Sequence, residues 1–334
     1  MNNQPRKKKP NLRDVAREAG VSVATVSRVL NTPDVVNAEK RQIVQAVIER
    51  LGFVRSAAAR SINSGRTKIF GALVPTLDSD IFALTLDALE KQLAGLGMSL
   101  VVATTNDDPE LETRKAEELL NIGVEGLFLS GVSHDEELLK LIERTRTPTL
   151  AMSYFDPQYR LPTIGYDNAL AARQALEHLI ELGHRNIAMV HGPTSNNDRT
   201  RARVEGTFAQ GVDVSYFETE LSAEGGSTAT RKSLKTGDPY DAYLCASDVL
   251  AFGVLSALSR EGIKVPNDVS VIGIHDLPSS SVTFPTLSTI RLPVQKMGIC
   301  AANALFEWAE KDVRPESICL PTELKAREST QRRS

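Results

Sequence analysis

Hydrophobic residues between positions 12 and 51 recur at intervals of three and four, which is the spacing of one face of a helix. This pattern predicts one helix over residues 12–19 and a second over residues 23–30, with Gly20 ending the first and Ser22 capping the second. The connection is only about three residues long, which is typical of a helix-turn-helix. A third helix is predicted after Asn37, and its buried face is expected to contain Ile43, Val47 and Leu51.

A short alanine-rich stretch, residues 56–63, follows this helical region. It predicts about two helical turns, and an isolated helix of that length is marginal in water. Residues 64–67 have the composition of a linker, so we place a domain boundary there.

From Ile69 onward, short apolar runs alternate with amphipathic helices. Strands are predicted over residues 69–74, 99–103, 126–129, 147–151, 187–190, 243–246 and 269–274. Helices are predicted over residues 82–96, 110–122, 168–182, 250–261 and 294–309. Continuous apolar strands that alternate with helices indicate parallel sheets covered on both faces, and roughly nine strands favour two doubly wound halves over one. Such folds bind ligands at the carboxyl ends of their strands.

The charge is divided unevenly along the 334 residues. Residues 1–66 hold 13 Lys and Arg against 5 Asp and Glu, a net of +8, and the remaining 26 basic and 37 acidic residues give −11. A basic head suits a polyanion, most often nucleic acid, although a solvated basic tail has the same composition.

Other features exclude several classes of protein. No uninterrupted apolar run of about 18 residues predicts a membrane span, and the first residues do not resemble a secretory signal. Three widely spaced cysteines, Cys245, Cys300 and Cys319, are expected to be thiols in a reducing cytoplasm. The common nucleotide-binding, hydrolase and zinc-protease motifs are absent, and His178 and His184 lack metal-ligand spacing. We therefore expect a binding protein without catalytic residues, metal or cofactor.

Residues 12–31, LRDVAREAGVSVATVSRVLN, resemble the amino-terminal signature of the lactose/galactose repressor (LacI/GalR) family. The resemblance continues through residues 59–62 and 65–67, and then in the same order through residues 181–188, 191–193, 203–206, 246–248, 265–273 and 285–290. It spans about residues 11–328 of the chain.

This resemblance implies a helix-turn-helix domain in residues 1–55, a hinge helix and linker in residues 56–67, and an effector-binding and dimerisation domain in residues 68–334. The last domain would resemble periplasmic sugar-binding proteins, with two α/β subdomains. The implied function is that of a cytoplasmic repressor that binds a palindromic operator in double-stranded DNA as a homodimer and responds to a sugar or sugar acid. The alternative is an enzyme or a transport binder with an incidental basic head.

The second helix of a helix-turn-helix enters the major groove, with its first residues against base edges. Val23, Ala24 and Arg28 are therefore the predicted base contacts, and Arg28 can give two hydrogen bonds to guanine. Arg28 could instead be solvated or bound to phosphate, and Ser22 could be a cap only. The remaining predicted contacts of this unit with DNA are Leu12, Ser22, Thr25, Ser27 and Asn31.

By the same resemblance, Ala59 and Ile62 belong to a narrow hinge helix that contacts DNA beside its twin from a second copy. Ile62 would be an apolar wedge between base steps in the minor groove. The alternative is that Ile62 packs on the body. The hinge should be ordered only on the operator, which would make it the switch.

The predicted ligand residues either follow strands at their carboxyl ends or match the family's cleft. Arg203 matches an arginine that grips the ligand, and a guanidinium suits a carboxylate or vicinal hydroxyls. The alternatives are a surface salt bridge for Arg203 and helix capping for Asp167 and Asp248. The full predicted set is Ser130, Asp167, Arg203, Ser247, Asp248 and His275.

The sequence departs from the family pattern at several places. Arg55-Ser56 replaces Pro-Asn before the hinge, Ile62 replaces leucine, and the segment after Gly206 is shorter by about two helical turns. His275 stands where most relatives have an aspartate, and repressors of gluconate utilisation resemble this chain there. A protonated imidazole adds positive charge, so we expect an anionic effector such as an aldonate. In the alternative, His275 turns away and Asp276 accepts hydrogen bonds from a neutral sugar.

Overall fold

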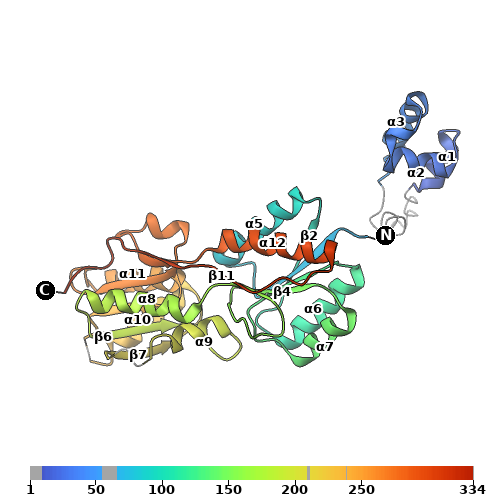
Figure 1. The fold of residues 1–334 in the computed structure, drawn as a ribbon. Coiled ribbons are helices and arrows are strands. Elements are labelled where there is room, and N and C mark those ends of the chain that lie inside the picture. The colour runs from blue at the N-terminus through green and yellow to red at the C-terminus, as the bar shows by residue number, and fades with distance from the viewer. Residues whose placement is uncertain (1–9, 55–65, 209–210, 238, 334) are drawn as a thin grey trace, which may run out of the picture. The chain divides into compact units, whose positions relative to one another are not determined.

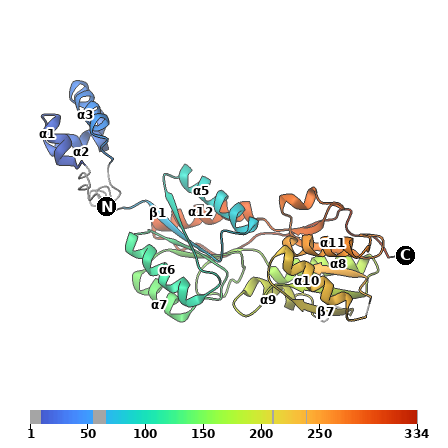
Figure 2. The ribbon, with the colours of Figure 1, turned by 180° about the vertical axis from the view of Figure 1, so that it is seen from behind.

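The computed structural model describes residues 10–54, 66–208, 211–237 and 239–333 (Figures 1 and 2). It divides into two compact units, residues 1–67 and residues 68–334, and each unit is described by itself. The predicted hinge residues Ala59 and Ile62 lie outside the described residues.

The described part of the first unit contains helices α1 (Leu12–Glu18), α2 (Val23–Asn31) and α3 (Ala38–Leu51), with the short 3-10 helix η1 (Pro33–Val35) after α2. The predicted capping box forms between Asn11 and Asp14. The Ser22 hydroxyl accepts a hydrogen bond of 3.1 Å from the amide of Thr25, so Ser22 caps α2 as predicted.

One prediction about α3 is wrong. Ile43 is 44% exposed, whereas its neighbour Val44 is fully buried together with Val47. The buried stripe of α3 continues through Ile48 and Leu51 in steps of three and four, and Ile43 lies one position outside it.

The second unit consists of two lobes, each built on a sheet whose described strands number six. Lobe 1 has the strand order β11-β5-β4-β3-β1-β2, and lobe 2 has the order β12-β10-β9-β8-β6-β7. Neighbouring strands are parallel except for β10 and β12 at the edge of lobe 2. The prediction of two doubly wound parallel sheets is therefore confirmed, with one antiparallel edge pair added.

The strands of lobe 1 are β1 (Ile69–Val74), β2 (Ser99–Thr104), β3 (Leu127–Ser130), β4 (Thr149–Met152), β5 (Thr163–Gly165) and β11 (Ile318–Cys319). Those of lobe 2 are β6 (Asn186–His191), β7 (Asp213–Glu218), β8 (Ala242–Cys245), β9 (Ser270–His275), β10 (Ser288–Arg291) and β12 (Glu323–Lys325).

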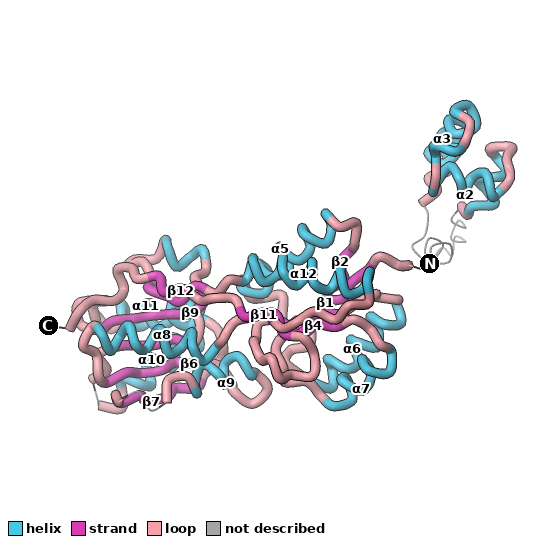
Figure 3. Tube along the Cα trace, in the orientation of Figure 1, coloured by secondary structure: helices cyan, strands magenta, loops and turns pink. Residues whose placement is uncertain are grey.

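Helices cover the sheets of both lobes (Figure 3). In lobe 1, α5 (Asp80–Gly95) packs against α12 (Val294–Lys311), and α6 (Pro109–Ile122) packs against α7 (Glu136–Thr145). In lobe 2, α8 (Asn168–Glu181) pairs with α9 (Asp198–Glu205), α10 (Ala223–Leu234) pairs with α11 (Asp248–Arg260), and a 3-10 helix, η2 (Pro278–Ser281), follows β9. Among the described helices, none has the length and apolar character that a membrane crossing requires.

The chain passes between the lobes at residues 166–167, 292–293 and 320–322, because each of these segments joins an element of one lobe to an element of the other. We call these segments the crossings. As a result, α12 and β11 come late in the sequence but complete lobe 1.

Candidate functional sites

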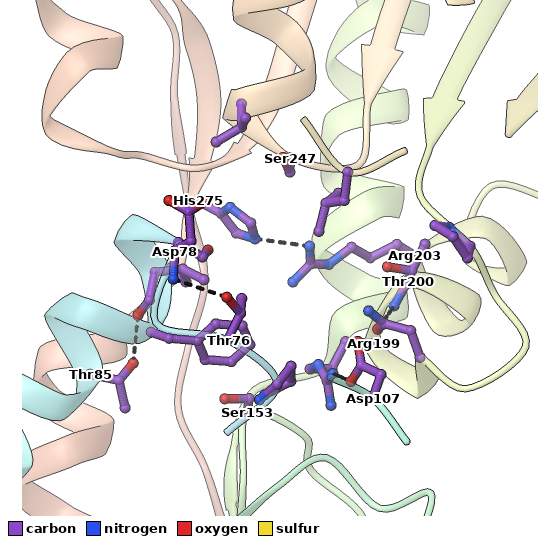
Figure 4. A pocket seen from close by; sticks show the side chains of 18 of the residues that line it. Thr76, Asp78, Thr85, Asp107, Ser153, Arg199, Thr200, Arg203, Ser247 and His275 are labelled. Carbon is purple, nitrogen blue, oxygen red and sulfur yellow. Dashed lines mark hydrogen bonds and ion pairs between the residues drawn. The ribbon is translucent and has the colours of Figure 1, made fainter. Parts of the chain in front are cut away.

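A cavity of about 460 Å³ lies between the two lobes (Figure 4). Lobe 1 contributes Thr76, Phe82 and Asp107 to its lining, and lobe 2 contributes residues of α9 and of the ends of β8 and β9. These segments follow the carboxyl ends of parallel strands, where such folds hold ligands. The volume is in the range of small-molecule sites.

Arg203 of α9 is a buried cation whose described partners are all neutral. Its Nε donates to Oδ1 of Asn168 at 3.0 Å, and its Nη1 donates to the carbonyl of Ala246 at 2.7 Å and to Nε2 of His275 at 2.9 Å. Among the described residues, no carboxylate lies within 4.0 Å of the guanidinium. Burial lowers the pKa of Arg203 to about 10, so the group remains charged at neutral pH. The alternative of a surface salt bridge is therefore wrong.

His275 ends β9 and points at Arg203 inside the cavity (Figure 4). A guanidinium can only donate, so Nε2 of His275 accepts and carries no proton. Burial lowers the pKa of His275 well below its ordinary value, and the charge of Arg203 lowers it further. The expectation that a protonated His275 supplies positive charge is therefore wrong, because a fixed cation already occupies the position beside it.

Asp248 does not line the cavity, contrary to prediction. It is fully buried, and its carboxylate accepts hydrogen bonds from Thr289 Oγ1 at 2.6 Å, Ser280 Oγ at 2.7 Å and the Leu277 amide at 2.9 Å. It is not the helix cap either, because the Ser247 hydroxyl caps α11. Asp248 instead fixes the segment that follows β9.

Of the other predicted ligand residues, one lines the cavity and two do not. Ser247 lines the cavity together with Arg203 and His275. Asp167 is exposed and caps α8 by accepting from the Leu170 amide at 2.8 Å, so its capping alternative holds. Ser130 lies at a smaller hollow beside the cavity and not in the cavity itself.

The cavity wall holds a second pair, the buried Arg199 with the half-buried Asp107, and the carboxylate of this pair was not predicted. Arg199 of α9 donates to Oδ1 of Asp107 at 3.2 Å and to the carbonyl of Ser130 at 3.1 Å. Asp107 follows β2, and the run Asn106-Asp107-Asp108 at the end of an apolar strand is a signal that could have identified it. Burial raises the pKa of Asp107, although Arg199 acts in the opposite direction.

Contacts around Gly131 join the two lobes beside the cavity. The carboxylate of Asp198, in lobe 2, accepts hydrogen bonds from the amides of Val132 and, at 2.8 Å, Ser133 in lobe 1. Gly131 has a φ of 85°, and a Cβ there would lie 2.2 Å from Nη1 of Arg199. Only glycine permits this approach, so we call residues 131–133 with Asp198 and Arg199 the lobe contact.

The first residues of α2 form an exposed surface in the first unit. Val23 is 41% exposed, and Ala24 and Arg28 are exposed beside it. The hydroxyl of Ser22 is engaged with Thr25 in the cap, at 2.9 Å between the two oxygens. Two further predicted contacts form a hydrogen bond with each other, since Nδ2 of Asn31 donates to Oγ of Ser27 at 3.2 Å. Leu12 is half-buried.

A helix-turn-helix unit followed by a two-lobed α/β body with a cavity between its lobes defines a DNA-binding regulator of the ligand-binding type. The model for the lacI family of bacterial regulatory proteins matches residues 11–56, and that for the periplasmic binding protein-like domain matches residues 176–330. The chain belongs to the lacI family of bacterial transcriptional regulators and is not an enzyme.

Relatives and solved structures match over most of their lengths. The chain is 34% identical to the regulator MalR of Streptomyces coelicolor over 89% of each chain. It is 32% identical to the regulator GntR of Pseudomonas aeruginosa over 96% of each. The structure of the lac repressor dimer bound to operator and the anti-inducer ONPF is 27% identical, with a TM-score of 0.86 over 97% of this chain and 100% of that one.

A complex of the regulator CelR with cellobiose is 28% identical to the chain. Its TM-score is 0.69 over 96% of this chain and 99% of that one.

Proposed function

We propose that the protein is a repressor that binds a palindromic operator as a homodimer in the cytoplasm and responds to an anionic sugar acid, with gluconate as the leading candidate. The observation that carries the choice of effector is Arg203, a buried cation in the cavity wall whose described partners are neutral. A buried charge without a counter-ion is costly, and an anion that enters the cavity removes that cost.

The charges around the cavity have unequal effects on a ligand. Asp78 and Glu220 also line it, but both are exposed to water, which screens their repulsion of an anion. Arg203 is 5% exposed, so its attraction acts in a medium of lower dielectric constant. A sugar acid can place its carboxylate at Arg203 and turn its hydroxyl groups toward Asp107 and the exposed carboxylates. The cation then has an anionic partner, and the carboxylates of the protein accept hydrogen bonds from the hydroxyl groups.

His275 preserves this positive charge because it accepts from Arg203 without neutralising it. An aspartate at the same position would form an ion pair with the guanidinium. The cavity would then favour hydroxyl groups over a carboxylate, since the aspartate accepts hydrogen bonds from neutral sugars. The residue at position 275 therefore determines whether the cavity favours an anionic or a neutral ligand.

The proposed operator contacts lie on the exposed start of α2. Val23 and Ala24 lack donors and suit thymine methyl groups, and the Arg28 guanidinium suits guanine. The homodimer follows from the same layout, because one helix-turn-helix per chain reads one half-site of a palindrome.

Calorimetry with matched ligands tests the effector. The full-length protein should bind gluconate and bind glucose, which has the same carbon skeleton without the carboxylate, at least about tenfold more weakly, as the loss of one charge-assisted hydrogen bond predicts. His275→Asp should abolish gluconate binding. His275→Asn introduces a side chain of the same size as that aspartate but without its charge, and it should retain more of the binding. Glucose binding as tight as gluconate binding would show that the cavity does not recognise the carboxylate. Gluconate binding that survives His275→Asp would show that the residue at position 275 does not set the charge of the ligand.

A further inference from the structure

His275, in the wall of the cavity, and the residue after it, Asp276, both have backbone conformations that favour glycine. His275 has a φ of 136° and Asp276 a φ of 59°. Residues with side chains keep such conformations only where their surroundings hold them, and these conformations cluster at ligand sites and switch regions. The contacts that hold this pair are therefore informative about its role.

The two side chains are held from opposite directions. Arg203 holds the imidazole of His275 on the cavity side. On the other side, the carboxylate of Asp276 accepts from Nε of Arg291 at 2.6 Å and from Nη2 of Arg327 at 2.5 Å. The Asp276 side chain is only 6% exposed. Burial raises its pKa, but the hydrogen bonds and the positive charges of Arg327 and Arg291 together leave the pKa below its ordinary value.

One partner of Asp276 adjoins a crossing, and the other follows the strand β12 that comes after a second crossing. Arg291 is the last residue of β10, directly before the crossing at residues 292–293, and Arg327 follows the crossing at residues 320–322. The Leu292 amide in the first of these crossings also donates to the carbonyl of His275, over a long 3.4 Å. One contact thus reaches a crossing directly through Leu292, and two reach the chain beside a crossing, through Arg291 and, beyond β12, through Arg327.

We propose that Asp276 is a positioning residue that holds His275 against Arg203 and transmits occupation of the cavity to the crossings at residues 292–293 and 320–322. An anion that engages the Arg203 guanidinium draws it from Nε2 of His275, and the released strain moves Asp276 with Arg291 and Arg327. The identity of the ligand as an anion rests on the proposed function. The link from His275 through Asp276 to the crossings does not depend on it.

Hydrogen exchange on the full-length protein without ligand tests the connection alone. Asp276→Asn removes the charge but keeps a side chain that tolerates a φ near 59°. Amide exchange should become at least about threefold faster at residues 274–277 and at the crossing amides of Leu292, Leu320 and Thr322, since the other crossing residues, Pro293 and Pro321, have no amide hydrogen. Local opening follows the loss of the contacts that hold a segment. Faster exchange at residues 274–277 alone would overturn the transmission.

Glu136→Gln is the matched control, because it replaces a carboxylate that pairs with Arg160 at 2.7 Å, away from the cavity and the crossings. It should leave exchange at the crossings unchanged. Faster exchange at the crossings in this control as well would also overturn the proposal, since the effect would not depend on Asp276.

The second measurement is the coupling between ligand and DNA. Operator DNA is selected by the full-length protein from palindromic random-sequence duplexes, and its affinity is measured with and without saturating gluconate. Coupling factors of regulators are typically about 5–150-fold, and Asp276→Asn and Arg327→Met should each reduce the factor to about twofold or less. A mere loss of stability would lower the melting temperature but leave this ratio intact.

The outcomes separate the two ideas. If the wild type binds no gluconate, the proposed effector fails, and the exchange experiment still decides the role of Asp276. If gluconate binds and Asp276→Asn retains the wild-type coupling factor, the transmission through Asp276 is wrong while the effector stands.

Discussion

Arg203 donates a hydrogen bond of 2.9 Å to Nε2 of His275, so two basic side chains meet in the cavity and only one of them is charged. Their proximity keeps the pKa of His275 low, with burial as the larger cause. Positive charge in the cavity is therefore fixed by Arg203 and does not vary with the titration of a histidine.

This relationship predicts how folding stability depends on pH. The unfolded chain takes up a proton at His275 near its ordinary pKa of about 6.5, whereas the folded protein does not. Acidification through that range therefore favours the unfolded state, with a slope of up to about 1.4 kcal/mol per pH unit for this one proton. His178 and His184 also have lowered pKa values because of burial, so only a comparison with His275→Asn isolates the contribution.

Denaturant unfolding at pH 7.5, 6.5 and 5.5 measures both slopes. The wild type should lose stability more steeply than His275→Asn below about pH 6.5, and the two should run parallel above it. Equal slopes throughout would mean that the folded protein also binds this proton.

The affinity of the wild type for gluconate should not change between pH 6 and 8.

Gly131→Ala should weaken the lobe contact. The added Cβ would lie 2.2 Å from Arg199, and the φ of 85° adds backbone strain. We expect a loss of about 2–4 kcal/mol in the free energy of unfolding, the sum of overpacking and strain. Gly97→Ala is the control, because Gly97 has a similar φ of 74° and no atom within 4 Å of the added Cβ. Equal losses for the two variants would show that the lobe contact contributes nothing.

Ile62→Ala should weaken operator binding and leave gluconate binding intact, because a shorter wedge recovers less energy from the unstacked bases. We expect a loss of about 1–2 kcal/mol, or about 5–30-fold in operator affinity. Fluorescence anisotropy at one fixed salt concentration measures it. An unchanged operator affinity would exclude the wedge, and a parallel loss of gluconate affinity would favour packing of Ile62 on the body.

Phe284→Ser should shift the protein from dimer toward monomer. Phe284 is 97% exposed and Val282 in the same loop is 79% exposed, and large apolar side chains that adjoin on a surface indicate a contact with another chain. Sedimentation of the wild type at micromolar concentration should show a dimer. Val313→Ser, at a position 65% exposed in the segment after α12, should leave the dimer intact. A dimer that survives Phe284→Ser would place the interface elsewhere.

Much of the fold could be predicted because its periodicity is regular. The strand over residues 69–74 was expected with its observed bounds, and five body helices were located to within a few residues. Helix α10 was not predicted, because its buried face is made of small residues. A Cβ at Gly226 would lie 2.2 Å from the carbonyl oxygen of Leu250, so α10 packs on α11 through close backbone approach. The buried residues of α10 are therefore small, and α10 shows no period of large hydrophobic residues.

The candidate site was harder to predict than the fold because residue type and position do not specify burial or partners. Arg203 and His275 were expected at the cavity, but only their mutual distance shows which of them carries charge. Asp248 follows a strand as ligand residues do, yet three donors from the segments around Ser280 and Thr289 occupy its carboxylate. Those donors lie about 30 to 40 residues away in sequence, beyond any local pattern.

The late position of β11 and α12 in the chain has a consequence for synthesis. The core of the first unit involves only residues 12–53, so it can form as soon as that segment leaves the ribosome. Lobe 1 requires β11 beside β5, and so it remains unfinished until Cys319 has emerged. Each new molecule therefore acquires the helices that read DNA well before it acquires the cavity that controls them. A translating ribosome thus carries, for most of the elongation time, a chain whose first unit is folded and whose sensor does not yet exist.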